Sequence, residues 1–171
     1  MLRETLFRSV PRLLLLVLAF SLAGNSIARV RATVDSINVL DSTLSDTVRL
    51  KGKVVYLDFW ASWCPYCQKS FPCMNQLANR YQKDGLQIVA VNMDKDRQSA
   101  RQFIDKMKPT FEIIFDSTGV LATRFGVKAM PTSFIYGRDG RLRSRHEGFR
   151  VHDTLKLDSL VRSLLGNEPS N

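Results

Sequence analysis

The segment VVYLDFWASWCPYC, residues 54–67, decides how this chain folds. Its first half, Val54–Trp60, is almost continuously apolar, which is typical of a central strand covered on both faces. Cys64 and Cys67 follow at the point where the strand would end and a helix begin. The free N–H groups and partial positive charge of a helix N-terminus stabilise a thiolate, lowering a cysteine pKa from about 8.5 to about 3.5–7.5. This spacing therefore predicts a dithiol that makes, breaks or passes on disulfides.

Other chemistries for two closely spaced cysteines fit this sequence less well. A zinc site would need a second Cys/His pair at suitable spacing, and only Cys73, His146 and His152 remain. A c-type haem attachment would need a histidine where the chain has Gln68. A purely structural disulfide would close too short a loop to contribute much chain entropy. A Cu(I) site that uses both sulfurs stays open as the competing prediction.

At 171 residues the chain fits a single domain, and its N-terminus indicates secretion. Residues 1–28 combine a basic start, an apolar core over residues 13–23 and the small-x-small sequence Ser26-Ile27-Ala28, as in a signal peptide. The apolar core is shorter than the about 20 residues that a membrane-spanning helix needs. We expect cleavage after Ala28, with an uncleaved N-terminal anchor as the alternative. Either arrangement places the domain outside the cytosol, where disulfides persist, and we expect a bacterial periplasm.

The domain, expected over residues 29–166, alternates strand-like and helix-like segments, and a loose tail follows over 167–171. We expect short strands and turns over 29–50. Further strands are predicted over 54–60, 86–93, 111–115, 133–136 and 142–146, the last two as an antiparallel hairpin. Helices are predicted from the dithiol to about Gly85 and over 96–108, 118–125 and 153–165. This order predicts an α/β sandwich of three layers.

The chain is basic, with a formal net charge of +9. Much of the excess lies in five arginines, Arg138, Arg141, Arg143, Arg145 and Arg150. One interpretation is attraction to an anionic membrane surface or an acidic partner. The other, which we favour, is a solvated hairpin with alternating exposed arginines. No aromatic interleaving or nucleic-acid module accompanies these charges, so we expect no nucleic-acid partner.

Taken together, these residues resemble the thioredoxin superfamily and, within it, the TlpA/ResA-like extracytoplasmic thioredoxins. The resemblance covers about residues 35–165 and rests above all on the WCxxC motif with Met130-Pro131-Thr132 downstream. It extends to Gly52-Lys53-Val54-Val55, residues 58–64, Phe71-Pro72, Val89-Ala90-Val91-Asn92, Phe125-Gly126-Val127 and Asp139-Gly140. The resemblance implies a thioredoxin-like α/β/α sandwich with a central mixed sheet, in which the helix and strand over 96–115 are the insertion typical of this branch.

The resemblance also implies roles for three catalytic residues. Cys64 is the exposed nucleophile and Cys67 the buried resolving thiol, and the chemistry agrees, because Cys64 lies nearer the helix start. Cys64 would attack a substrate disulfide, and Cys67 would then attack Cys64 and release the reduced substrate. Asp58 matches the family's buried acid beneath the dithiol, where apolar surroundings raise a carboxyl pKa and suit it to exchange a proton with Cys67. This chemistry needs no bound cofactor.

Pro131 matches the family's cis-proline, which packs beside the dithiol. A cis bond is found in only about 5–6% of X–Pro pairs, and here it would leave the Met130 backbone free to pair with an extended substrate chain. The Met130 thioether is soft and polarizable, so with Cys64 and Cys67 it would complete the Cu(I) site of the competing prediction. The predicted substrate-binding residues are Trp63, Pro65, Tyr66, Met130, Pro131 and Thr132.

The dipeptide Pro65-Tyr66 between the cysteines is similar to that of glutaredoxins, which predicts a somewhat more oxidising couple than thioredoxin has. Cys73 stands outside the motif, and we expect a buried, inert small hydrophobe there. A regulatory or intermolecular disulfide is the alternative for this odd thiol. His146 and His152 are expected at the surface.

The sequence therefore predicts an extracytoplasmic thiol–disulfide oxidoreductase that reduces protein disulfides, for example in cytochrome c maturation. We expect a monomer whose partners are protein disulfides or thiols and an upstream electron donor, such as a membrane thiol reductase. A Cu(I) metallochaperone is the first alternative, and a non-catalytic module that keeps only the fold is the second. Oxidation or isomerisation of disulfides stays open as the direction of the reaction.

Overall fold

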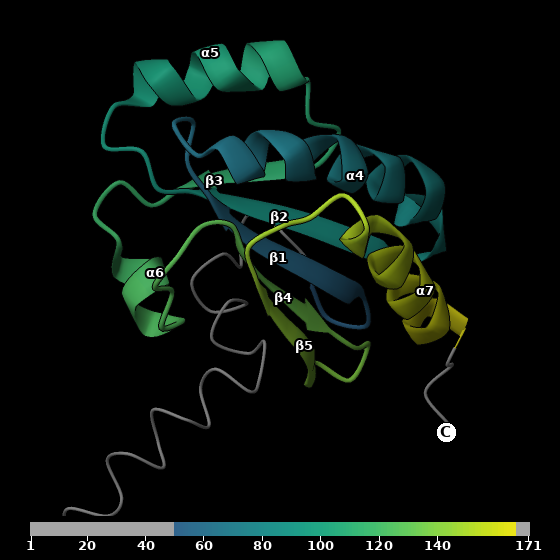
Figure 1. The fold of residues 1–171 in the computed structure, drawn as a ribbon. Coiled ribbons are helices and arrows are strands. Elements are labelled where there is room, and N and C mark those ends of the chain that lie inside the picture. Colours follow the sequence, from purple (N-terminus) through teal and green to yellow (C-terminus); the bar gives the residue numbers. More distant parts are fainter. Residues whose placement is uncertain (1–49, 167–171) are drawn as a thin grey trace, which may run out of the picture. The chain divides into compact units, whose positions relative to one another are not determined.

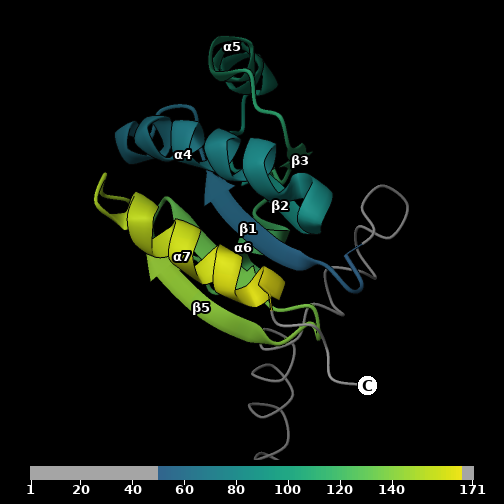
Figure 2. The same ribbon diagram turned by 90° about the vertical axis from the view of Figure 1, so that its right-hand side faces the viewer.

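The computed structural model describes residues 50–166, which form a five-stranded sheet with helices on both faces (Figures 1 and 2). The strands are β1 (Val54–Trp60), β2 (Leu86–Asn92), β3 (Glu112–Phe115), β4 (Thr132–Tyr136) and β5 (Leu142–Glu147). The helices are α4 (Pro65–Tyr81), the 3₁₀ helix η1 (Gln82–Asp84), α5 (Arg97–Met107), α6 (Val120–Arg124) and α7 (Asp153–Gly166). The predicted signal segment, the turns expected before residue 50 and the tail over 167–171 lie outside the described residues.

The sheet is mixed, and β1 lies at its centre in the order β3-β2-β1-β4-β5. β1 pairs in parallel with β2 and antiparallel with β4, while β3 and β5 add a parallel and an antiparallel edge. Trp60 and Asn92 face each other where β1 and β2 end, so the loops that follow them meet at one edge of the sheet. The central mixed sheet implied by the resemblance is confirmed.

Alternate side chains of β1 supply two separate cores, because successive residues of a strand point to opposite faces. The even-numbered apolar residues of β1 pack with the buried residues of α4, α5 and α7. The odd-numbered ones pack with the buried residues of α6 on the other face. Figures 1 and 2 show α4 and α7 side by side over the sheet. These layers confirm the predicted α/β/α sandwich, and α5 and β3 form the expected insertion.

Local sequence explains where the helices begin. α4 starts at Pro65, since the missing N–H of a proline is not needed in the first turn, and Cys64 is its N-cap. The Asp96 carboxylate caps α5 by accepting hydrogen bonds from two backbone N–H groups of the first turn. α6 is shorter than the predicted 118–125, because Asp116 accepts a hydrogen bond from the N–H of Val120 and fixes the start there. None of the helices between residues 50 and 166 has the length and apolar character needed to cross a bilayer.

Candidate redox site

The dithiol lies between the end of β1 and the start of α4. Cys64 and Cys67 are joined by a disulfide. Cys64 is also the N-cap of α4, and the backbone N–H of Cys67 donates to its Sγ at 3.2 Å. A helix N-terminus with an N–H directed at a sulfur stabilises negative charge on that sulfur. This geometry favours a thiolate at Cys64 once the disulfide is reduced.

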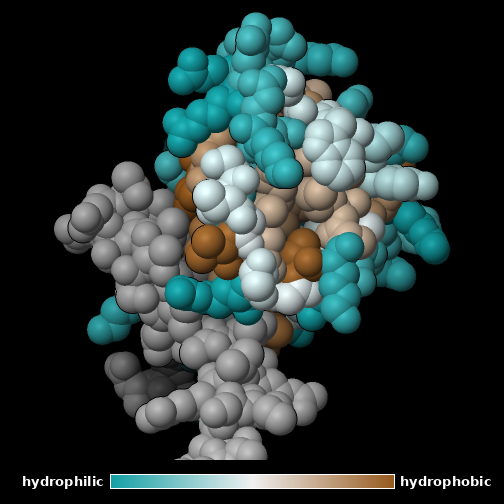
Figure 3. Space-filling view, turned by 90° about the vertical axis from the view of Figure 1, so that its left-hand side faces the viewer, coloured by the Kyte–Doolittle hydropathy of each residue, from teal (hydrophilic) through white to brown (hydrophobic). Residues whose placement is uncertain are grey.

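The accessibility of the nucleophile differs from the prediction. Cys64, expected to be exposed, is only 3% exposed, while Cys67 is fully buried as expected. Cys64 Sγ is covered because it is bonded to Cys67 and lies 3.5 Å from the carbonyl oxygen of Met130. The neighbouring residues Trp63 and Tyr66 are instead 67% and 54% exposed. Figure 3 shows the molecule from the side on which α4 begins, where apolar surface is framed by hydrophilic side chains.

The loop before β4 approaches the dithiol from a distant part of the sequence. The Met130–Pro131 peptide bond is cis, which confirms the expectation for Pro131. The backbone carbonyl oxygen of Met130 points at Cys64 Sγ, 3.5 Å away. Thr132 is fully buried, and its hydroxyl donates to the carbonyl of Ala129 at 2.7 Å. The Thr132 side chain therefore holds its own turn together.

Asp58 lies on the face of β1 that α4, α5 and α7 cover, as its even position between Tyr56 and Trp60 requires. It is 1% exposed, and its Oδ2 accepts no hydrogen bond from residues 50–166. Burial raises the pKa of Asp58 well above its ordinary value, because the charged form loses its hydration. The expected buried acid is therefore present, and it can hold a proton under conditions in which an ordinary aspartate is charged.

A second buried carboxyl, Asp94, holds the loop that precedes the dithiol, and sequence analysis missed it. Ser62 donates to it twice, from its backbone N–H at 2.9 Å and from its hydroxyl at 3.0 Å. Asn92 Nδ2 donates to Asp94 at 2.7 Å, and the N–H of Asp94 donates back to Asn92 Oδ1 at 3.2 Å. The signal that could have found this contact is the place of Ser62 and Asp94 just after two strands. The parallel pairing of β1 and β2 brings the residues after both strands to one edge of the sheet.

Cys73 is the free thiol of α4, and it is buried as predicted, at 5% exposed. Burial raises the pKa of the Cys73 thiol, although a side-chain hydrogen bond with Thr154 opposes the shift. A thiol with a raised pKa holds little thiolate and is a poor nucleophile. In the part of the chain that the structure describes, no three His, Cys, Asp or Glu side chains gather in a way that would hold a metal ion.

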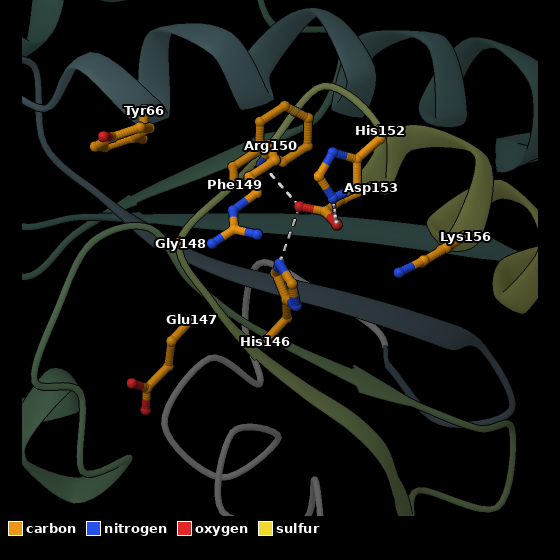
Figure 4. A pocket seen from close by; sticks show the side chains of 9 residues that line it. All are labelled: Tyr66, His146, Glu147, Gly148, Phe149, Arg150, His152, Asp153 and Lys156. Carbon is orange, nitrogen blue, oxygen red and sulfur yellow. Dashed lines mark hydrogen bonds and ion pairs between the residues drawn. The ribbon is translucent and has the colours of Figure 1, made fainter.

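His146 and His152 flank a single carboxylate (Figure 4). His146 Nε2 lies 3.3 Å from Asp153 Oδ2, and His152 Nε2 lies 3.5 Å from Asp153 Oδ1. His152 is exposed as predicted, but His146 is partly buried, because it packs against the buried Asp153 at the start of α7. These three residues line a pocket together with Tyr66.

The arginines of the β4–β5 hairpin follow the expected alternation. Arg141, Arg143 and Arg145 are exposed, with partly buried residues between them. Arg143 and Arg145 form ion pairs at 2.6 and 2.7 Å with acidic residues of the same hairpin. Arg138 instead donates hydrogen bonds to backbone carbonyls of three other segments. Part of the positive charge of the hairpin is therefore neutralised within the protein.

Known proteins match both this sequence and this fold. The pattern of the AhpC/TSA family matches residues 30–145. The thiol-disulfide oxidoreductase ResA of Geobacillus thermodenitrificans is 29% identical over 162 residues, which cover 90% of this chain and 93% of the relative. The ResA of Bacillus thuringiensis subsp. konkukian is 32% identical over 106 residues, or 62% of this chain and 61% of the relative. A solved structure from Chlorobium tepidum, assigned to the thiol:disulfide interchange protein DsbE, is 44% identical with a TM-score of 0.68, covering 72% of this chain and 85% of that one.

These matches agree with the features already described. The structure itself has the central mixed sheet, the Cys64–Cys67 disulfide at the start of a helix and the cis bond at Pro131. The family pattern covers more than half of the chain. The chain therefore belongs to the AhpC/TSA family within the thioredoxin superfamily and is a ResA-like thiol–disulfide oxidoreductase.

Proposed function

We propose that the chain is an extracytoplasmic reductant, which reduces disulfides of protein substrates through Cys64 and Cys67. The observation that carries this proposal is the disulfide at the start of α4, with Cys64 Sγ 3.5 Å from the Met130 carbonyl beside cis-Pro131. The pattern of residues 1–28 supports the location. The relatives named as a thiol-disulfide oxidoreductase and a thiol:disulfide interchange protein support the chemistry.

The reaction transfers two electrons from the dithiol to the substrate. In the reduced protein, the Cys64 thiolate attacks one sulfur of a substrate disulfide, forming a mixed disulfide and releasing a substrate thiolate, which takes up a proton. Cys67 then loses its proton and attacks Cys64 Sγ. The mixed disulfide breaks, the Cys64–Cys67 disulfide forms, and the second substrate sulfur leaves as a thiol after protonation. An upstream thiol donor returns the protein to its reduced form.

Asp58 has the position and the chemistry to serve the second step. It lies on the face of β1 that α4 covers, two residues before the strand ends at Trp60, and Cys67 of α4 is fully buried and separated from water. In its charged form, a buried carboxylate with an unpartnered oxygen, as Oδ2 of Asp58 is, is a strong proton acceptor, because protonation removes the cost of the buried charge. Asp58 therefore takes the proton of Cys67 as the thiol becomes a nucleophile.

The substrate binds across the dithiol in this proposal. The contact surface consists of the exposed side chains of Trp63, Pro65 and Tyr66 and of the loop that carries Met130 and Pro131. An extended substrate segment pairs with the Met130 backbone as an added strand, which places its disulfide against Cys64. The buried side chain of Thr132 supports this loop from within, through its hydrogen bond to the Ala129 carbonyl.

The wider role follows from the location and the direction of electron flow. We propose that the protein acts as a monomer on substrates outside the cytosol, such as those of cytochrome c maturation. Its proposed electron donor is a membrane thiol reductase. Pro65-Tyr66 favours a dithiol/disulfide couple somewhat more oxidising than that of thioredoxin. Its reduction potential would then lie closer to that of an oxidant. The reduction potential is therefore the decisive quantity.

That potential is measured by equilibrating the full-length protein with glutathione buffers and alkylating the remaining thiols. A value near that of thioredoxin, about −270 mV, supports a reductant, whereas a value near −120 mV indicates an oxidant and contradicts the proposal. Reduction of insulin disulfides gives the activity itself. Cys64→Ser must abolish it, and the matched variant Cys73→Ser must retain it, because Cys73 takes no part in the exchange.

A titration with Cu(I) distinguishes the competing metallochaperone. Stoichiometric Cu(I) retention by the reduced protein, together with failure to reduce insulin, would favour that alternative. Wild-type function in cells for Cys64→Ser would favour a non-catalytic module. The proposal requires that the reduced protein reduces insulin and that Cys64→Ser abolishes function in cells.

A further inference from the structure

Beside the redox site, the structure contains a pocket of about 510 Å³, and the reaction described above uses only its Tyr66 wall (Figure 4). Tyr66 at the start of α4 forms one wall. The loop between β5 and α7, with Gly148 and Arg150, forms another, and the first turn of α7 contributes Asp153 and Lys156. The pocket therefore lies between the dithiol helix and the C-terminal helix.

Two observations show that this pocket lies beside the reacting sulfurs. Tyr66 is the residue between Pro65 and Cys67 in the motif, so the pocket begins at the dithiol itself. The backbone N–H of Gly148 donates to the carbonyl of Pro131 at 2.7 Å, so the opposite wall is bonded to the cis-proline loop. A substrate chain paired with that loop has this pocket directly beside it.

The acidic side chains that line the pocket already have partners. Glu147 forms an ion pair with Arg145 at 2.7 Å. Asp153 is contacted by His146 and His152 and accepts a hydrogen bond from the N–H of Arg150 at 2.7 Å. Burial raises the pKa of Asp153, but the N–H of Arg150 and the two imidazoles outweigh this effect and hold the pKa below its usual range. Glu147 is thus neutralised by Arg145, while the Asp153 carboxylate is held in place by the Arg150 N–H and the two imidazoles.

The basic side chains that line the pocket are in the opposite situation. Arg150 and Lys156 are exposed, and neither forms an ion pair with any other residue between 50 and 166. Figure 4 shows the two side chains extending on either side of Asp153. The pocket therefore presents two separated positive charges to solvent, next to a site at which protein chains are expected to bind.

We propose that this pocket binds an acidic segment of the protein substrate that flanks the disulfide to be reduced. This inference rests on the function proposed above and names its preferred substrates. The planar guanidinium of Arg150 matches a carboxylate with two parallel hydrogen bonds, and the ammonium of Lys156 adds a second point charge. Because the two cations extend on either side of Asp153 (Figure 4), they suit two carboxylates spaced along a chain.

The test uses the reduced full-length protein and three peptides that contain the same intramolecular disulfide. Their flanking residues are Asp and Glu, the neutral Asn and Gln, or Lys and Arg. We expect the second-order rate constant of reduction to be about tenfold higher for the acidic than for the neutral peptide at low ionic strength, and this preference to shrink as salt is added. The basic peptide should be reduced most slowly.

Variants then locate the preference. Arg150→Gln combined with Lys156→Gln should lower the ratio of acidic to neutral rate constants to about twofold. Lys83→Gln combined with Arg162→Gln removes the same charge from exposed positions outside the pocket, and it should preserve the ratio. Comparison of the two double variants separates a local contact from attraction by the net charge of the whole protein.

Each other result has a definite meaning. If the wild-type protein reduces all three peptides at one rate, the inference is wrong and the proposed function stands. If both double variants lose the preference equally, only the overall charge acts and the pocket is not a binding site. If no peptide is reduced while the protein is fully in its dithiol form, the proposed function itself is wrong.

Discussion

Asp58 lies in β1 and Asp94 in the loop that follows the neighbouring strand β2; both are almost completely buried, at 1% and 4% exposed, yet their surroundings are opposite. Asp94 accepts three hydrogen bonds, two from Ser62 and one from Asn92. Asp58 Oδ2 accepts none from the described residues. Burial alone therefore does not reveal what a carboxyl does, whereas its hydrogen-bond partners do.

The two arrangements have different energetic consequences. An intramolecular hydrogen bond contributes about 0.5–1.5 kcal/mol to stability, so the three contacts of Asp94 stabilise the loop before the dithiol. A buried polar atom without a partner instead costs about 1–3 kcal/mol. A fold keeps such a cost where function requires it. The comparison predicts that Asp94 matters for stability and Asp58 for the exchange reaction.

Removing Asp94 should have the largest effect on stability. Asp94→Ala leaves the Ser62 N–H, the Ser62 hydroxyl and Asn92 Nδ2 without their acceptor, and we expect the free energy of unfolding of the oxidised protein to fall by about 3 kcal/mol. Urea unfolding measures this change. Asp105→Ala, at an exposed position of α5, is the matched control and should lie within about 0.5 kcal/mol of wild type. A loss below about 1 kcal/mol for Asp94→Ala would remove the contrast between the two carboxyls.

Asp58→Asn should have the largest effect on the resolving step. Without a carboxylate to take its proton, Cys67 attacks the mixed disulfide more slowly, by about 100-fold near neutral pH. The chromogenic disulfide dithiobis(nitrobenzoate) separates the steps, because Cys64 releases the first coloured thiolate and Cys67 the second. We expect only the second phase to slow markedly.

The same assay on Asp94→Ala provides the reciprocal control. Its second phase should remain within a few-fold of wild type, since Asp94 supports the loop before the dithiol. Equal slowing of both phases in Asp58→Asn would mean that the substitution disturbs the whole site, and the catalytic role given to Asp58 would then be wrong.

Sequence patterns predicted the parts of the site that lie within one continuous segment. The apolar run of β1 and the cysteines at the start of α4 fixed the strand, the helix and the place of the dithiol. The alternation of side chains along β1 placed Asp58 on the covered face. Cis-Pro131 was expected only from the family resemblance, because no local pattern around it specifies its bond.

Contacts between distant residues were not predictable in this way. The bond between Ser62 and Asp94 joins two loops that only the parallel pairing of β1 and β2 brings together. The partial burial of His146 depends on Asp153, seven positions along the chain and beyond a turn. The cover over Cys64 comes from Met130, which lies 66 residues away. Each of these requires the assembled fold, and a single sequence gives no pairing information for them.

The unsatisfied carboxyl of Asp58 should also appear in the pH dependence of stability. Because its pKa is raised by burial, the native state binds more protons than the unfolded state above about pH 4, and stability falls as pH rises from there through the raised pKa. Asp58→Asn lacks this loss. We expect the free energy of unfolding of the variant to exceed that of wild type by about 2 kcal/mol at pH 8, and by less at pH 4. Urea unfolding of the oxidised proteins across this range gives the two curves, and parallel curves would contradict a buried, titrating Asp58.

Removing a single contact of Asp94 should have the smallest effect and sharpens the comparison most. Ser62→Ala deletes the hydroxyl that donates to Asp94 Oδ1 at 3.0 Å but keeps the backbone N–H bond to Oδ2. We expect a loss of about 1 kcal/mol in the free energy of unfolding and no change in the second phase of the chromogenic assay. In a double-mutant cycle with Asp94→Ala, the two losses should be strongly non-additive, because the second substitution removes a bond that the first has already broken. Additive losses would show that Ser62 and Asp94 stabilise the protein independently, and the loop before the dithiol would then be held by other contacts.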